Sequence, residues 1–265
     1  MRLEIQNVSC GYKKDKPVLE HVTMELSDGD ICCILGPNGV GKTTLFKTIL
    51  GMLPMLQGSI SINGEDLNGF SDKQRARVIA YVAQTHTPTF PYLCEDIVMM
   101  GRIGAVSRFS QPTRHDTEVV ERIISEMGID FLKGIPYTDI SGGERQLLMI
   151  AKALAQEPDV LILDEPTANL DFGNMSKVLA RLKALADNGL CIIFTSHLPD
   201  QALIMNSKVA LISRNEPIKF GPCRQIVTAA NLQKSYGAPV QVVDVITSEG
   251  KPLRLCSPKL DEIEL

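Results

Sequence analysis

The chain lacks three features, each of which would point to a different class of protein. No apolar run among its 265 residues approaches the roughly 18 residues of a membrane-spanning helix. The start of the chain is charged and alternating, without the apolar core of a signal peptide, so we expect a protein that stays in the cytoplasm. Basic residues are not in excess, because 27 Lys and Arg stand against 31 Asp and Glu, for a net charge of −4. This balance disfavours a duplex or ribosome partner, and we expect no nucleic-acid binding.

A cysteine arrangement typical of metal binding is also missing. The seven cysteines are odd in number and scattered, and no Cys-x-x-Cys pair occurs. Cys32 and Cys33 are adjacent in an apolar run, so in a strand they would point to opposite sides, which is poor spacing for a shared metal. We expect reduced thiols and no structural metal. With a hydrophobic share of 44%, the chain is long enough for one large α/β domain with a full core.

The most informative segment that is present runs from residue 36 to residue 44. It fits the pattern G-x-x-x-x-G-K-[ST] of a phosphate-binding P-loop and directly follows the apolar run 31–35. A buried strand before the loop and a helix after it would point backbone N–H groups and the positive helix end at one position, which favours a phosphate. The alternative is a glycine-rich strand-to-helix turn without a ligand, which the motif in this context disfavours.

The P-loop pattern assigns a role to each of its residues. Lys42 can reach the β- and γ-phosphates of a nucleotide, and the Thr43 hydroxyl can ligate Mg²⁺. The glycines let the backbone approach the phosphates closely. The predicted nucleotide-binding residues of this loop are Gly36, Pro37, Asn38, Gly39, Val40, Gly41, Lys42, Thr43 and Thr44.

Hydrophobic periodicity predicts an α/β protein with two additions. Fully apolar runs at 31–35, 160–163 and 190–195, with helical patterns at 43–50 and 173–186 between them, predict a mostly parallel core sheet. Alternating segments at 3–5 and 18–26, with 59–62 before an Asn63-Gly64 turn, predict an antiparallel β-lobe. A further strand is expected at 79–82, and helical patterns at 95–100, 114–127 and 142–156 predict a helical insert.

The same periodicity sets the expected organisation of the chain. Residues 1–84 and 157–221 form the nucleotide-binding core with its β-lobe, and residues 85–156 form the helical subdomain. The C-terminal extension, 222–265, contains helix-like stretches at 222–230 and 231–236 and strands at 240–246 and 253–255.

Two carboxylates follow the apolar run 160–163. Asp164 and Glu165 would lie at the carboxyl end of a buried parallel strand, which is where open α/β sheets bind ligands. We predict that Asp164 holds the Mg²⁺ shell and that Glu165 orients or deprotonates the attacking water. On their own such pairs are about as often merely solvated, and it is the P-loop that favours the catalytic interpretation.

The segment 140–146, Ile-Ser-Gly-Gly-Glu-Arg-Gln, indicates the family. It resembles the LSGGQ signature of ABC ATPases, with Ile140 in place of Leu and Glu144 in place of Gln. A simpler interpretation is a capping box, in which Ser141 and Glu144 begin an ordinary helix. Both can hold, because a capped helix whose first turn is Gly142-Gly143 exposes N–H groups to an anion. By this resemblance Ser141, Gly142 and Gly143 contact ATP.

The whole chain resembles the nucleotide-binding subunit of an ABC transporter, a P-loop NTPase fold. Tyr12 matches the residue that stacks on adenine, and Gln84 matches the residue that links Mg²⁺ and water to the helical insert. Asp171 lies in a segment similar to the D-loop, and His197 matches the switch histidine that touches the γ-phosphate. Taken alone, Tyr12 could be a surface turn residue and His197 a solvated or capping side chain.

The resemblance also implies partners. Two ATPase chains would face each other head to tail, so that each ATP lies between the P-loop of one chain and residues 141–143 of the other. Separate membrane permeases would dock at about residues 85–115, on the cytoplasmic face of the membrane, and a substrate-binding protein would act indirectly. Residues 95–102, with Phe109 and Pro112, are similar to importer ATPases for iron chelates, haem, cobalamin and molybdate. We expect an importer, with iron chelate as the first candidate substrate. The alternatives are a soluble ABC ATPase of iron–sulfur cluster assembly and an exporter.

Overall fold

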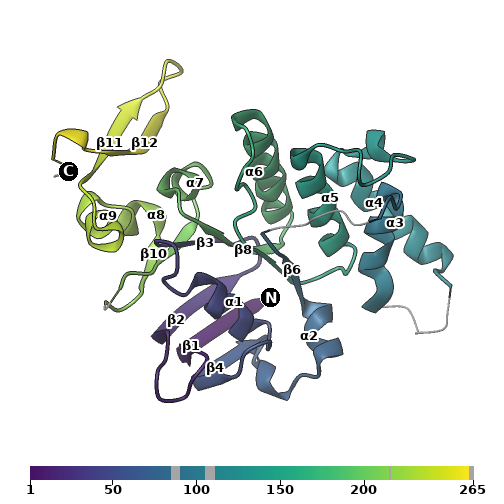
Figure 1. Cartoon of the computed structure of the whole chain (residues 1–265), viewed down its shortest axis with the longest axis horizontal. Helices are drawn as coiled ribbons and strands as arrows, with labels where there is room; N and C mark the ends of the chain where they lie inside the picture. The colour runs from purple at the N-terminus through teal and green to yellow at the C-terminus, as the bar shows by residue number, and fades with distance from the viewer. Residues whose placement is uncertain (85–89, 105–110, 215, 263–265) are drawn as a thin grey trace. The chain divides into compact units, whose positions relative to one another are not determined.

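The chain forms two compact units. The computed structural model describes residues 1–84, 90–104, 111–214 and 216–262 (Figure 1). The first unit comprises residues 1–68 and 193–265, and the second comprises residues 69–192. The helical section expected at 85–156 falls within the second unit, and its proposed bounds remain a prediction.

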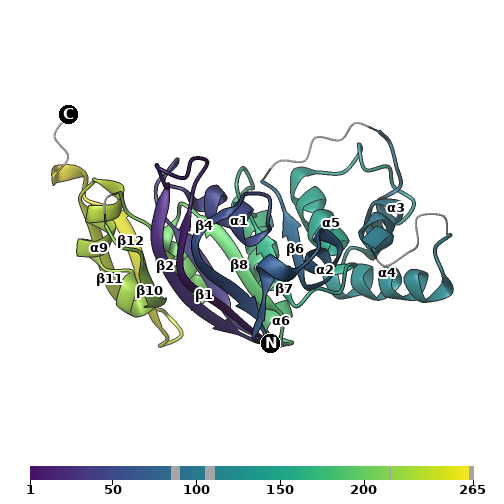
Figure 2. The same ribbon diagram turned by 90° about the horizontal axis from the view of Figure 1, so that it is seen from below.

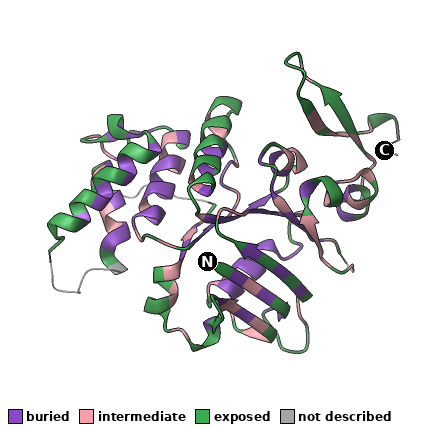
Figure 3. Ribbon diagram, turned by 180° about the vertical axis from the view of Figure 1, so that it is seen from behind, coloured by how far each residue is buried: buried purple, intermediate pink, exposed green. Residues whose placement is uncertain are grey.

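An antiparallel sheet of the first unit forms the predicted β-lobe, with strand order β2-β1-β4-β5. Its strands are β1 (Arg2–Cys10), β2 (Leu19–Ser27), β4 (Met55–Ile62) and β5 (Glu65–Asp66). Leu3 and Ile5 of β1 are buried while their neighbours are not, and Figure 3 shows this alternation as bands across the sheet. Asn63 and Gly64 both have positive φ, 53° and 83°, as the tight hairpin turn between β4 and β5 requires.

The apolar runs that lead to the predicted nucleotide site form buried strands. In the first unit β3 (Ile31–Leu35) pairs in parallel with β9 (Lys208–Leu211), which pairs antiparallel with β10 (Lys219–Pro222). Next to β3 runs β8 (Cys191–Ser196), whose six residues are all buried. Helix α1 (Lys42–Ile49) follows β3, and α7 (Pro199–Ile204) follows β8.

The second unit contains the predicted helices and two parallel strands. Strand β6 (Ile79–Val82) pairs with β7 (Val160–Leu163), and both predictions are confirmed. The helices are α2 (Asp72–Val78), α3 (Cys94–Met99), α4 (Arg114–Met127), α5 (Gly142–Leu154) and α6 (Phe172–Asp187). Helix α5 packs against α3, α4, α6 and β6, so it is the centre of this unit. The short helix α2 was not predicted.

Gly101 lies at a tight backbone contact in the helical part of the second unit. It belongs to η2 (Met100–Gly104), and a Cβ added there would lie 2.1 Å from the Lys152 carbonyl oxygen and 2.8 Å from the Ala155 Cβ. We therefore expect Gly101→Ala to lower the free energy of unfolding by about 2–3 kcal/mol in denaturant titrations. Gly69→Ala is the control, because its Cβ would meet nothing within 4 Å. Equal stability of the two variants would contradict the close packing at Gly101.

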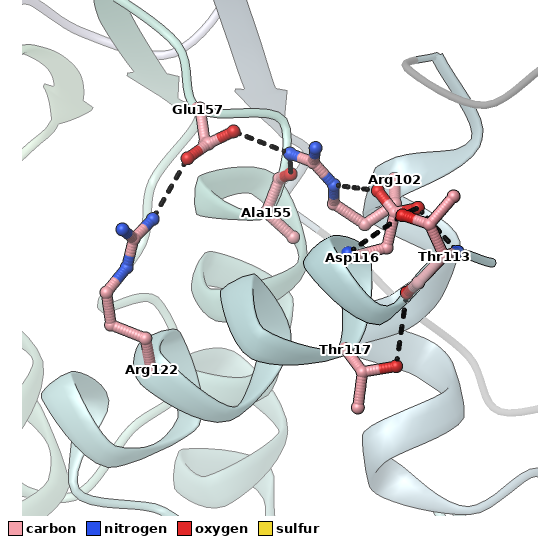
Figure 4. A network of polar contacts seen from close by, with 7 residues as sticks. All are labelled: Arg102, Thr113, Asp116, Thr117, Arg122, Ala155 and Glu157. Atoms are coloured by element: carbon pink, nitrogen blue, oxygen red, sulfur yellow. Dashed lines mark hydrogen bonds and ion pairs between the residues drawn. The ribbon is translucent and has the colours of Figure 1, made fainter.

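A buried network of ion pairs joins η2 to α4 and to the end of α5 (Figure 4). Arg102 and Asp116 have side chains only 6% and 5% exposed, and Nε of Arg102 donates to Oδ1 of Asp116 at 2.9 Å. The Nη1 atom of Arg102 donates to the Ala155 carbonyl at 2.7 Å and to Oε2 of Glu157 at 2.9 Å. Arg122 donates to the other oxygen of Glu157 at 2.9 Å. The network connects segments that are distant in the sequence.

The C-terminal extension consists of two helices and a hairpin. Helices α8 (Cys223–Ile226) and α9 (Ala229–Tyr236) precede β11 (Val240–Ile246) and β12 (Pro252–Pro258), and η4 (Leu260–Glu262) follows. The two strands pair antiparallel, and Figure 2 shows them beside α9. The Cys256 amide donates to Oδ1 of Asp200 at 2.8 Å, which joins the hairpin to α7 within the first unit. A cavity of about 330 Å³ lies between α7, α9 and the hairpin.

Candidate functional site

The P-loop lies between β3 and α1, and two of its glycines occupy positions where a side chain would collide with neighbouring atoms. Gly36 has φ 153°, and a Cβ there would lie 2.7 Å from the Ile212 carbonyl oxygen. Gly41 has φ 116°, and a Cβ there would lie 2.9 Å from the side chains of Val18 and Leu19. Gly41 is also the N-cap of α1. Because it has no side chain, it makes no capping hydrogen bond to the first N–H groups of the helix.

Lys42 lies along the inside of the loop. Its residue is 6% exposed, and Nζ donates to the carbonyl of Gly36 at 2.7 Å and to that of Pro37 at 3.2 Å. The ammonium can exchange these carbonyl oxygens for the oxygens of a phosphate. Thr44 is buried, whereas Thr43 is exposed at the first turn of the helix.

These residues fit a nucleoside triphosphate with its metal. The loop is open at Gly39, where a Cβ would meet nothing within 4 Å, and it leads into a helix N-terminus with a lysine ammonium beside it. The Thr43 hydroxyl and the Asp164 carboxylate are hard oxygen ligands of the kind that Mg²⁺ prefers. Within the described residues no group of three or more His, Cys, Asp or Glu side chains could hold a metal by itself.

The second unit brings Gln84 and Glu165 together. Nε2 of Gln84 donates to Oε2 of Glu165 at 2.9 Å. Glu165 follows Asp164 at the end of β7 and has φ 47°, in the left-handed region that non-glycine residues rarely occupy. Such strain is typical of functional positions. Gln84 therefore orients the carboxylate that the sequence singled out.

Tyr81 is a site neighbour that sequence reasoning missed. It lies on β6 opposite Ile162 of β7, two residues before Asp164. Burial raises the pKa of the Tyr81 hydroxyl to about 12, and the Asp164 charge and a hydrogen bond to it act in the same direction. Tyr81 thus stays protonated and can donate to the predicted Mg²⁺ ligand. One aromatic residue in a strand gave no signal in the sequence.

The signature segment begins α5 with the predicted capping box. Oγ of Ser141 accepts from the Glu144 amide at 3.3 Å, and Oε2 of Glu144 accepts from the Ser141 amide at 2.8 Å. Hydrogen bonds to the carboxylate from the Ser141 hydroxyl and then from the Ser141 amide lower the pKa of Glu144. Gly142 is exposed, with open space where a Cβ would sit, so backbone N–H groups of this turn can approach an anion.

Asn174 joins the signature segment to the D-loop, and sequence reasoning did not single it out. A Cβ on Gly143 would lie 2.4 Å from Cγ of Asn174. Asp171, the N-cap of α6, accepts from the Asn174 amide at 2.8 Å and from its Nδ2 at 2.7 Å. The hydrogen bond from the Asn174 amide is the main reason that the pKa of Asp171 is lowered.

The remaining predicted residues lie in the first unit. Tyr12 is 64% exposed, which leaves its ring accessible for stacking. His197 is exposed directly after β8, in a turn where Oγ of Ser196 accepts from the Leu198 amide at 2.9 Å. The P-loop, Tyr12 and His197 thus belong to one unit, and Gln84, residues 141–143, 164–165 and Asp171 belong to the other.

All seven cysteines are free thiols, and burial raises the pKa of Cys32 to about 12. A thiol with so high a pKa is a poor nucleophile and a poor metal ligand at neutral pH. Among the described residues, no helix combines the length and the apolar character needed to cross a membrane.

Comparison with known proteins gives matches along most of the chain. A family model described as ABC transporter matches residues 19–168. An uncharacterized ABC transporter ATP-binding protein of Haemophilus influenzae is 39% identical over 89% of each chain. The molybdate import ATP-binding protein MolC of the same organism is 33% identical over 90% of this chain and 89% of its own. A solved structure, described as an inward-facing metal-chelate type ABC transporter, is 31% identical with TM-score 0.86 and covers 97% of both chains.

Proposed function

The chain belongs to the ABC transporter family as an ATP-hydrolysing subunit, and from this premise we propose that it powers import of a metal compound through separate membrane permeases. The observation that carries the proposal is the likeness to the metal-chelate type transporter, which covers 97% of each chain. The small uncovered share is much shorter than the C-terminal extension, so the likeness reaches into the extension as well as the ATP-binding core. Iron chelate is the first candidate substrate.

The proposed ATP site takes its phosphate contacts from the P-loop and its water-activating groups from the second unit. Residues 36–44 hold the phosphates, with Lys42 at the β- and γ-phosphates. Thr43, Asp164 and Gln84 hold Mg²⁺, which when bound neutralises charge on the phosphate oxygens. Glu165 orients or deprotonates the attacking water, and its hydrogen bond to Gln84 at 2.9 Å supports that placement.

We further propose that two copies form the complete site, head to tail. Tyr12 stacks on adenine and His197 touches the γ-phosphate in one copy, while residues 141–143 and Asp171 approach from the other. The exposed Gly142 and the open first turn of α5 support a role in binding an anion from outside the chain. ATP then closes the dimer and hydrolysis opens it.

The permease contact is proposed at about residues 85–115, with the subunit held on the cytoplasmic face of the membrane. Support comes from exposed apolar side chains in the described part of this range: Phe90, Tyr92, Leu93 and Ile103. Residues 85–89 and 105–110 lie outside the described residues. A substrate-binding protein would act through the permease and not on this chain.

Several metal compounds remain candidates for the substrate. MolC is a molybdate import protein by name, which keeps molybdate beside iron chelate, haem and cobalamin. A soluble ATPase of iron–sulfur cluster assembly and an exporter ATPase would use the same ATP residues, so they differ from this proposal in their partners.

Purification from native membranes tests the proposal directly. Tagged Glu165→Gln protein, solubilised in detergent with ATP and Mg²⁺, is expected to retain a polytopic membrane protein that mass spectrometry identifies. A tagged Lys42→Ala protein is the matched control, and it should retain less of the partner if ATP closes the complex. Recovery of soluble partners alone would refute the importer and favour cluster assembly. Uptake of labelled iron chelate and molybdate by cells with and without the subunit then distinguishes the substrates.

A further inference from the structure

The C-terminal extension reaches the entrance of the P-loop through two consecutive residues at the end of α9. Ser235 is buried, and its Oγ donates to the Ile212 carbonyl oxygen at 2.9 Å. Ile212 directly follows β9, and its amide donates to the Leu35 carbonyl at 2.8 Å. Leu35 is the last residue of β3, immediately before the loop. Ser235 therefore fixes a residue that is itself bonded to the first peptide of the loop.

The same Ile212 carbonyl supports the first glycine of the loop. A Cβ on Gly36 would lie 2.7 Å from this oxygen, so the Gly36 backbone is packed directly against it. An oxygen at such close range limits how Gly36 can move. Ser235 orients that oxygen by donating to it. Through Ser235 and Ile212 the extension thus acts on the backbone of the loop.

The hydroxyl of Tyr236, the next residue, neighbours the backbone N–H of Gly36. Its hydroxyl oxygen is buried and has no hydrogen-bond partner within the described part of the chain. Burial raises the pKa of this hydroxyl above its ordinary value, and the backbone N–H of Gly36 acts in the opposite direction. The Gly36 N–H is therefore a neighbour of the phenol oxygen, although the two atoms do not meet the geometry of a hydrogen bond. A buried hydroxyl without a partner is costly and calls for an explanation.

We propose that Ser235 and Tyr236 are positioning residues for the P-loop, and that the Tyr236 oxygen accepts the Gly36 N–H when nucleotide is bound. Lys42 bonds the Gly36 carbonyl in this structure and must leave it to reach a phosphate. The loop backbone then needs another anchor. The peptide that joins Leu35 to Gly36 has two such neighbours, because the Ile212 amide donates to its carbonyl oxygen and the Tyr236 hydroxyl lies near its N–H. The cavity that borders Tyr236 leaves room on one side of the ring for the small shift required.

The inference rests on the proposed assignment of residues 36–44 as the nucleotide loop. It gives the C-terminal extension a part in ATP binding. An extension that only packs against the core would have no such part. Because the P-loop is contacted through its backbone, the effect should appear in nucleotide affinity and in KM for ATP. The turnover number should stay unchanged, because both residues act on the backbone of the loop, whereas Gln84 and Glu165 are the groups proposed to act on the attacking water.

The test compares ATP affinity with thermal stability in the full-length chain. For Tyr236→Phe we expect Kd for Mg²⁺ with a non-hydrolysable ATP analogue to rise about fivefold, the usual worth of one net hydrogen bond. Its melting temperature should stay the same or rise, because the lost oxygen has no partner without nucleotide. For Ser235→Ala we expect a similar rise in Kd and a lower melting temperature. In both variants KM for ATP should rise while kcat stays within twofold.

Ser207→Ala is the matched control. Ser207 is also buried, and its Oγ donates to the Ala202 carbonyl at 3.3 Å, away from the loop. Its loss should lower the melting temperature and leave Kd unchanged. If Kd instead follows melting temperature in all three variants, Ser235 and Tyr236 are purely structural and the inference is wrong. Unchanged Kd in Tyr236→Phe also overturns it.

A Lys42→Ala variant measured in parallel distinguishes failure of the loop assignment from failure of the role given to the extension. If Lys42→Ala binds the analogue as tightly as the unchanged chain, the loop assignment fails and the inference fails with it. If Lys42→Ala loses binding while Tyr236→Phe does not, the loop assignment stands and only the role of the extension is refuted.

Discussion

Glu165→Gln is expected to lower ATP turnover by about 10²- to 10⁴-fold while ATP binding persists. An amide cannot take a proton from water at neutral pH, so the chemical step would lose the base that we propose. The local geometry should survive, because the amide oxygen can still accept from Nε2 of Gln84, which lies 2.9 Å from Glu165 in the unchanged chain. Single-turnover phosphate release measures the chemical step, and equilibrium binding of ATP measures the site.

Glu118→Gln provides the control for this experiment. Glu118 is an exposed carboxylate on α4 that pairs with Arg114 at 2.9 Å, and its removal should leave turnover unchanged. A Glu165→Gln protein that hydrolyses ATP at the normal rate would disprove the base assignment. Loss of binding together with turnover would instead assign Glu165 to the structure of the site.

Arg102→Met is expected to lower the free energy of unfolding by about 3 kcal/mol, because it leaves buried Asp116 without its ion-pair partner. The substitution also removes the donors to the Ala155 carbonyl and to Glu157 (Figure 4). Urea titration of the full chain measures the loss. Arg114→Met removes an ion pair whose arginine side chain is 93% exposed, and we expect that control to cost less than about 1 kcal/mol.

Acid titration tests the same network from the carboxylate side. Hydrogen bonds from Thr113, and then from Arg102, hold the pKa of Asp116 at about 2, below its ordinary value. The folded chain binds this proton less readily than the unfolded chain, so the contribution of Asp116 to stability is complete above the unfolded pKa of about 4. It is lost as the pH falls from about 4 toward 2. Asp116→Asn should flatten the pH dependence of stability in that window, and an unchanged slope would contradict the assignment.

Much of the frame is predictable because burial leaves a mark in the sequence. The strands β3, β7 and β8 are apolar throughout since both faces are covered, and α4 has a Thr113 cap before it and Gly128 with φ 65° after it. Helix α2 leaves no such mark, because none of its residues is buried. Strand β9 has four residues and begins with Lys208, too short for a pattern.

The site follows the same division between local and distant signals. The P-loop is a continuous segment, and Asp164 and Glu165 are adjacent residues, so each can be recognised from the sequence alone. The contacts of Tyr81 with Asp164 and of Asn174 with Gly143 join residues far apart in the chain, and no single-sequence pattern records them. Ser235 and Tyr236 belong to the same class, since their effect on Gly36 passes through the fold.

The contact between Gly143 and Asn174 limits what a genetic lesion in the signature segment can mean. A methyl group at position 143 has to displace Asn174, the residue that Asp171 uses to cap α6. An allele with alanine there would therefore loosen the start of a sixteen-residue helix and at the same time alter the turn that we propose to face ATP. Loss of transport in such an allele therefore does not prove that a phosphate contact was lost. An allele at position 142, where a Cβ would meet nothing within 4 Å, alters the proposed contact without displacing Asn174.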